Sequence, residues 1–80
     1  MPTVLRMCGF EVRINTDDHE PPHVHVWKAG AWIKVAIGDE DTAAYVLKHG
    51  GMKPRDAVCA VRIVDNAWEM LLAHWRKIHG

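Results

Sequence analysis

The chain has few cysteines, no long apolar run and no excess of charge of either sign, and each shortage excludes a class of protein. Its two cysteines, Cys8 and Cys59, have neither the CxxC nor the CxxH spacing of a redox or zinc motif, so we predict two reduced thiols. No stretch approaches the roughly 20 apolar residues that span a bilayer. The amino terminus also lacks the basic and apolar regions of a secretory signal. These features predict a cytoplasmic protein that does not enter a membrane.

The chain also has no excess of positive or negative charge, because ten Lys and Arg residues balance ten Asp and Glu residues. This balance excludes the overall positive charge of strongly basic nucleic-acid binders, so RNA or DNA could be bound only by a local basic patch. Six histidines can add positive charge when the pH falls below about 6.5, where an unperturbed imidazole is protonated. No nucleophile triad, phosphate-binding loop or complete metal signature is present. Any chemistry must therefore be inferred from local clusters, and the sequence leaves open whether the protein is an enzyme.

What the sequence does contain is typical of a folded protein, with 49% hydrophobic and 25% charged residues. Eighty residues predict a single domain spanning residues 1–80. A core of this size supplies only about 3–5 kcal/mol of net stability. A metal, a partner or self-association would therefore matter, and we predict a homodimer.

Alternating apolar and polar residues predict a first hairpin in the amino-terminal part of the chain. A turn at residues 8–9 would pair Met7 with Phe10 and Leu5 with Val12 on the core face. A two-residue type I′ turn would require Cys8 to adopt a positive φ, which is uncommon for a residue with a side chain. We therefore expect a longer or bulged turn there.

A second hairpin is predicted around residues 29–30, with Val24 opposite Val35 and Val26 opposite Ile33 on the core face. Before it, the prolines in residues 19–22 predict a stiff loop. The same alternation predicts an outward binding face that collects His23, His25, Trp27, Trp32, Lys34 and Arg13.

The remaining residues predict a helix after an ambiguous segment. Residues 39–52 contain an acidic turn and two glycines, and they fit either a short helix or a fifth strand. From Pro54 an apolar residue recurs every three or four positions, which predicts a helix too long for one sheet to cover. It must bend near Asn66, or its end carrying Trp75 and Ile78 must meet another chain. The predicted fold is α+β: an antiparallel sheet of four or five strands, formed from two hairpins, with one long carboxy-terminal helix on one face.

The cluster of histidines at residues 19–25 suggests two kinds of chemistry. His19, His23 and His25 have the composition of a catalytic zinc site with an open position, although same-face neighbours on a strand stand about 6.5–7 Å apart. We expect no cofactor, and zinc or another divalent metal is the alternative. His23 or His25 beside Glu20 or Asp18 would alternatively resemble the acid–base pairs of metal-free ribonucleases. The catalytic candidates are therefore His23, His25 and Glu20.

A binding face is the third interpretation. Trp27 and Trp32, paired outward and edged by cations, are similar in kind to the aromatic platforms on which unpaired bases stack. Trp and Arg are also good anchors for a protein partner. A structural role, with the pair covered by residues 39–49 or by another subunit, is the alternative.

Three motifs carry a resemblance to a known family: Met1-Pro2-Thr3-Val4-Leu5-Arg6, the block HEPPHVHV at residues 19–26, and LLAHW at residues 71–75. With them the chain resembles a family of short bacterial and archaeal proteins of unknown function whose genes often lie beside toxin–antitoxin components. The resemblance implies a small α+β protein and no established chemistry. We expect a toxin–antitoxin-associated accessory or regulatory protein that binds a protein partner encoded nearby, RNA or DNA. The alternative is a small ribonuclease or metal-dependent hydrolase.

Overall fold

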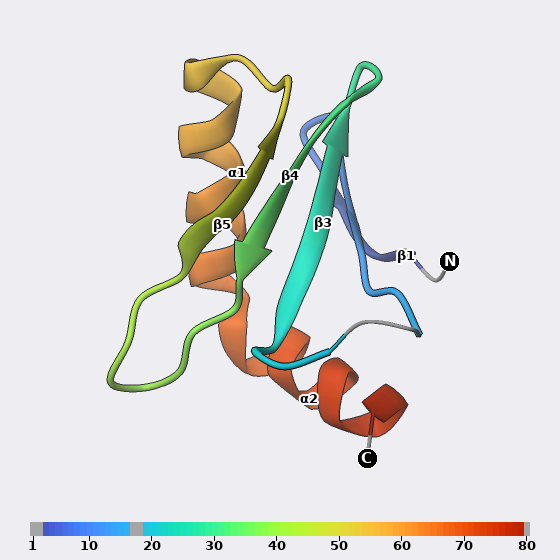
Figure 1. Cartoon of the computed structure of the whole chain (residues 1–80), viewed down its shortest axis with the longest axis vertical. Helices are drawn as coiled ribbons and strands as arrows, with labels where there is room; N and C mark the ends of the chain where they lie inside the picture. The colour runs from blue at the N-terminus through green and yellow to red at the C-terminus, as the bar shows by residue number, and fades with distance from the viewer. Residues whose placement is uncertain (1–2, 17–18, 80) are drawn as a thin grey trace.

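A computed structural model describes residues 3–16 and 19–79 and has a five-stranded antiparallel sheet followed by two helices (Figure 1). The strand order follows the chain order. Met1, Pro2 and Asp18, which carry part of the sequence predictions, lie outside the described residues. The elements are β1 (Thr3–Met7), β2 (Phe10–Arg13), β3 (His23–Lys28), β4 (Ala31–Ala36), β5 (Tyr45–Gly50), α1 (Pro54–Asn66) and α2 (Trp68–His79). The α+β class predicted from the sequence is confirmed.

The first hairpin has the predicted register, with Met7 opposite Phe10 and Leu5 opposite Val12. The prediction of a longer turn is wrong, because Cys8 and Gly9 form a two-residue turn with φ of 52° and 82°. Two positive φ values match the right-handed twist of the flanking strands, and this match outweighs the strain at a cysteine. The second hairpin makes the same kind of turn, with φ of 50° at Ala29.

The second hairpin also has the predicted register, which places Val24 opposite Val35 and Val26 opposite Ile33. All four side chains are fully buried. Strict alternation fixes this register, since a slip by one residue would move every valine to the other face. The core lies between this face of the sheet and the helices, where it meets the buried positions Ala57, Ala60, Val64, Leu71 and Trp75.

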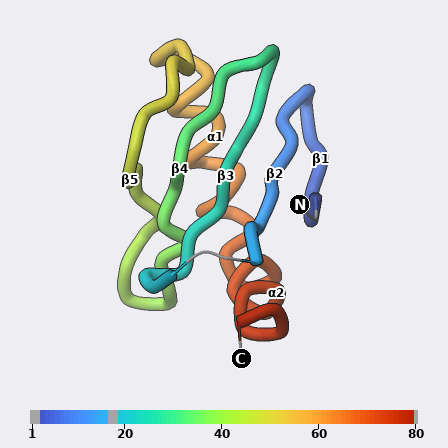
Figure 2. The backbone as a smooth tube through the Cα atoms, turned by 45° about the vertical axis from the view of Figure 1, so that its right-hand side comes forward, coloured from blue at the N-terminus to red at the C-terminus, as the bar shows by residue number. Residues whose placement is uncertain are grey.

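The predicted helix from residue 54 is divided at Ala67 into α1 and α2. Ala67 has left the helical φ/ψ region, and its N–H donates to the carbonyl oxygens of Ile63 and Val64. The predicted bend near Asn66 is thus present. Figure 2 shows the result: α1 runs along the sheet, and α2 lies across one end of it. Trp75 is buried within its own chain, at 2% exposure, so a second chain is not needed to cover it.

The ambiguous segment forms a loop and then the edge strand β5, which pairs with β4. The carboxylate of Asp39 accepts hydrogen bonds from the N–H groups of Asp41 and Thr42, each 2.8 Å long, and fixes a tight turn. The N–H of Ala44 donates to Asp65 of α1 at 3.0 Å. These bonds commit residues 39–44 to a loop and leave β5 to extend the sheet.

In the part of the chain that the structure describes, neither α1 nor α2 is long and apolar enough to cross a bilayer.

Candidate functional site

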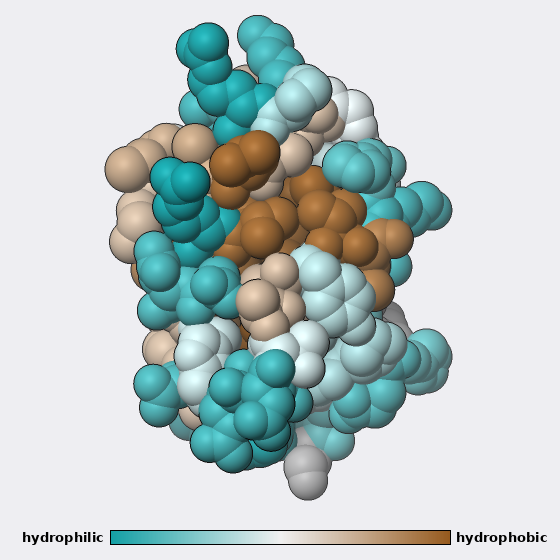
Figure 3. All heavy atoms as spheres, turned by 90° about the vertical axis from the view of Figure 1, so that its left-hand side faces the viewer, coloured by the Kyte–Doolittle hydropathy of each residue, from teal (hydrophilic) through white to brown (hydrophobic). Residues whose placement is uncertain are grey.

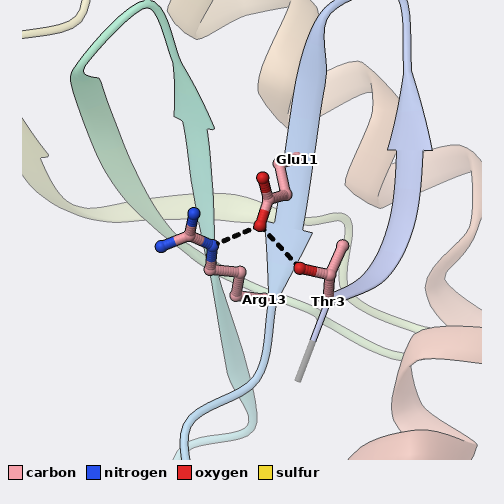
Figure 4. A network of polar contacts seen from close by, with 3 residues as sticks. All are labelled: Thr3, Glu11 and Arg13. Atoms are coloured by element: carbon pink, nitrogen blue, oxygen red, sulfur yellow. Dashed lines mark hydrogen bonds and ion pairs between the residues drawn. The ribbon is translucent and has the colours of Figure 1, made fainter. Parts of the chain in front are cut away.

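The face of the sheet turned away from the helices carries most of the predicted binding residues, and we call it the outer face. Figure 4 looks onto part of this face, with the helices behind the sheet. Arg13 from β2 faces His25 of β3, and His25 faces Lys34 of β4. Trp27 and Trp32 form the next cross-strand pair. Five of the six predicted binding residues are therefore neighbours on this face: Arg13, His25, Trp27, Trp32 and Lys34.

The aromatic rings of the outer face are in contact with one another. The ring centroids of Trp27 and Trp32 are 6.4 Å apart with an interplanar angle of 40°. The imidazole of His25 lies 6.0 Å from the Trp32 ring, and the guanidinium carbon of Arg13 lies 4.9 Å from the Trp27 centroid. These separations are in the range of favourable aromatic and cation–π contacts. Both indoles are half-buried, so part of each π surface faces solvent.

The position of Trp32 depends on Gly50, a residue to which the sequence assigned no role at the site. A Cβ atom built on Gly50 of β5 would lie 2.1 Å from Cε2 of Trp32. Only a residue without a side chain leaves room for the indole at this place. The alternative that residues 39–49 cover the tryptophan pair is wrong, because β5 lies beside β4 in the sheet and Trp32 spreads over its end.

Arg13 is held in place by a polar network that includes the carboxylate of Glu11 (Figure 4). Nε of Arg13 and the hydroxyl of Thr3 each donate to the same Glu11 oxygen at 2.6 Å. The hydrogen bond from Arg13, then that from Thr3, lowers the pKa of Glu11 from 4.5 to about 2. The same bond raises the pKa of Arg13. The network orients the guanidinium beneath Trp27.

His23 lies beside His25, with ring centroids 5.6 Å apart, but it is not exposed as the binding-face prediction required. Its side chain is buried, at 5% exposure, and its ring centroid lies 5.2 Å from that of Trp75. Nδ1 of His23 lies 2.8 Å from the carbonyl oxygen of Pro21. Because a carbonyl can only accept, Nδ1 is the donor and carries the hydrogen. The cause is the bend at Ala67, which brings α2 over the first residue of β3.

The loop of residues 19–22, which we call the entrance loop, borders a pocket with a volume of about 400 Å³. Lys34 and Lys48 are cross-strand partners beside it, on β4 and β5. The pocket brings together four residues to which the sequence assigns different roles. It also contains Lys48, which the sequence did not indicate because residues 39–52 fit either a helix or a strand. Its lining residues are His19, Glu20, Pro21, His23, Lys34, Leu47 and Lys48.

The predicted zinc trio does not come together. Within residues 3–16 and 19–79, no three His, Cys, Asp or Glu side chains are placed so that they could hold a metal ion. His19 is exposed in the entrance loop, whereas His23 is buried and bonded to Pro21. Glu20, the proposed oxygen ligand or acid–base group, accepts a long 3.5 Å hydrogen bond from Nε1 of Trp75. These contacts tie the loop to α2.

A separate apolar surface lies between β5 and α1. Figure 3 views this side of the molecule and shows hydrophobic side chains surrounded by polar ones. Val58 of α1 is 57% exposed there. A hollow of about 410 Å³ in this surface is lined by Val46, His49, Pro54, Ala57, Val58 and Val61.

Comparison with known proteins adds a family and no activity. No curated protein and no solved structure matches the chain. The sequence profile of a family described as "Domain of unknown function (DUF4160)" matches residues 9–76, which include every strand but the first and nearly all of both helices. On this match, the chain belongs to the DUF4160 family.

Proposed function

We propose that this protein is a binding module that holds single-stranded nucleic acid, RNA in particular, on the outer face of its sheet. The observation that carries the proposal is the contact between Trp27 and Trp32, whose rings lie 6.4 Å apart and partly open to solvent. Stacking of an unpaired base on such a ring contributes about 1–3 kcal/mol. Cations at the edge of the pair supply contacts for the phosphates.

The charge distribution supports the same proposal. Glu11 is the one carboxylate in the five strands as the structure describes them. Arg6, Arg13, Lys34 and Lys48 share the outer face by register. A chain of zero net charge thus has a local basic surface, and such a surface attracts a polyanion over about one Debye length, roughly 8 Å at physiological salt.

The biological setting is part of the proposal. The motif at residues 19–26 resembles a family encoded beside toxin–antitoxin components, so we assign the module an accessory or regulatory role in such a system. It would hold a transcript near a toxin or antitoxin. A protein partner on the same face is the competing occupant, and a nucleic-acid titration distinguishes the two.

Fluorescence anisotropy with a labelled single-stranded RNA tests the function. Trp27→Leu and Trp32→Leu keep apolar bulk and remove most of the stacking surface, so each should weaken binding by about fivefold to a hundredfold. Trp68→Leu in α2 is the matched control, and its affinity should equal that of the wild type. Unchanged binding by folded Trp27→Leu and Trp32→Leu proteins, or no RNA binding by the wild type, would overturn the proposal.

An enzymatic function is the second candidate, because His19, Glu20 and His23 line one pocket. A small ribonuclease or hydrolase there would use Glu20 as a proton carrier, or His25, whose ring centroid lies 5.6 Å from that of His23. Expression of the wild type should then arrest growth, and His25→Ala or Glu20→Gln should relieve the arrest. A binding module predicts that these two substitutions leave growth unchanged and that no RNA is cleaved.

A further inference from the structure

We propose that the pocket beside the entrance loop binds a phosphate monoester dianion, which under the proposed function is the terminal phosphate of the bound strand. This inference rests on the proposed function for the identity of the molecule that carries the phosphate. The pocket itself is defined by Lys34, Lys48 and the entrance loop.

Two like charges without a counter-ion lie at the side of the pocket. Lys34 and Lys48 are cross-strand partners beside a bulge in the β4–β5 register, so two positive charges lie on neighbouring strands and repel each other. By contrast, Arg13 of β2 bonds to Glu11 at 2.6 Å, and Lys28 at the end of β3 bonds to Asp56 of α1 at 3.2 Å. Among the residues that the structure describes, neither Lys34 nor Lys48 forms an ion pair. An anion between the two ammonium groups would remove the repulsion.

The charge of the ligand follows from the same pair. A phosphate monoester carries between 1.5 and 2 negative charges at pH 7, because its second pKa is near 6. An internal phosphodiester carries one. Two adjacent lysines therefore match a terminal phosphate better than an internal one. The volume of about 400 Å³ is that of about a dozen water molecules, which leaves room for the phosphate and part of its sugar.

Hydrogen bonds hold the wall of the pocket in shape. The carbonyl of Pro21 accepts from Nδ1 of His23, and the carbonyl of Pro22 accepts from the N–H of Ile37 at 3.0 Å. Glu20, which also lines the pocket, accepts a long 3.5 Å hydrogen bond from Nε1 of Trp75. A wall fixed at three points needs little reordering when a ligand binds, which favours affinity.

The pocket lies further along the strands than the tryptophan pair. On β4, Lys34 lies two residues from Trp32, so the two side chains are about 6.5–7 Å apart on the same face. The entrance loop lies beyond Lys34, at the end of the sheet that α2 crosses (Figure 2). A nucleic-acid strand whose bases stack on the tryptophans and whose backbone continues toward Lys34 therefore meets the entrance loop. Its end, with the terminal phosphate, would lie there.

Two titrations test the inference. Inorganic phosphate added to ¹⁵N-labelled protein should shift the amide signals of Lys34, Leu47 and Lys48, and Lys34→Gln or Lys48→Gln should abolish the shifts. Lys53→Gln, at an exposed lysine just before α1, is the matched control and should leave them intact. In anisotropy, an RNA with a 5′ or 3′ phosphate should bind about tenfold tighter than the same RNA with hydroxyl ends. That preference should vanish in Lys48→Gln.

The possible results separate the pocket from the outer face. If phosphate binds in the pocket but no RNA binds, the phosphate comes from a small molecule: the pocket stands and the proposed function fails. If RNA binds through Trp27 and Trp32 without preference for a phosphorylated end, and inorganic phosphate shifts no signal, the inference is overturned and the proposed function stands. Lys48→Gln should also raise the unfolding midpoint at low salt, since it removes the repulsion. A lower midpoint would mean that the lysine pair is structural and would count against the inference.

Discussion

The indole of Trp32 lies directly against the backbone of Gly50, so that a methyl group at position 50 would meet the ring at 2.1 Å. Gly50→Ala should therefore displace Trp32 and separate it from Trp27. Overpacking of this kind costs about 1–3 kcal/mol. We expect a lower urea midpoint together with weaker RNA binding.

Gly30→Ala is a matched control for that substitution. Gly30 has a positive φ of 82°, so alanine strains the backbone there, yet a Cβ would meet nothing within 4 Å. Stability should fall while the Trp27–Trp32 pair and RNA affinity stay unchanged. If Gly50→Ala bound RNA as well as the wild type, the tryptophan pair would not be the binding platform.

Substitution of His23 should lower stability more than it lowers binding, although the sequence predicts a place on the binding face for both His23 and His25. His23→Ala removes the hydrogen bond to Pro21 and the contact with Trp75, and we expect a loss of about 1–3 kcal/mol in the free energy of unfolding. His25→Ala, on the half-buried outer face, should cost less stability and more RNA affinity. Chemical denaturation and anisotropy on both variants measure the contrast, and equal losses of stability would contradict it.

The Glu11 network predicts an acid-dependent part of stability. Because folding lowers the pKa of Glu11 from 4.5 to about 2, the ionised carboxylate stabilises the fold, and this contribution is complete above about pH 4.5. It should decline as the pH falls from 4.5 toward 2. Glu11→Gln should lack this decline, so its unfolding midpoint should approach that of the wild type in acid. Thr3→Val removes one of the two donors and should shift the decline to higher pH. Parallel midpoints for wild type and Glu11→Gln across this range would contradict the network.

The hairpin registers were predictable because strict alternation with buried valines leaves one register that buries them all, as at Val24 and Val26. The bend was predictable because a straight helix from Pro54 onward would be longer than the strands that it packs against. His23 was misplaced because its burial depends on where Trp75 lies after that bend, which strand periodicity does not encode. Lys48 was missed since residues 42–49 suit helix and strand equally until the Asp39 turn decides between them.

The homodimer stays a prediction, and the apolar surface between β5 and α1 gives it a test. β5 is an edge strand with an unpaired side, and Val58, 57% exposed, lies on the helix beside it. A second copy related by a two-fold axis would pair the two β5 edges antiparallel and cover both valines. Val58→Glu should place two carboxylates in that contact and yield a monomer in light scattering. Val58→Ala should remain a dimer. Arg62→Glu, on the same helix but outside the hollow, controls for the added charge. A wild type that is monomeric at high concentration would overturn the prediction, and a Val58→Glu protein that is still dimeric would move the interface away from β5.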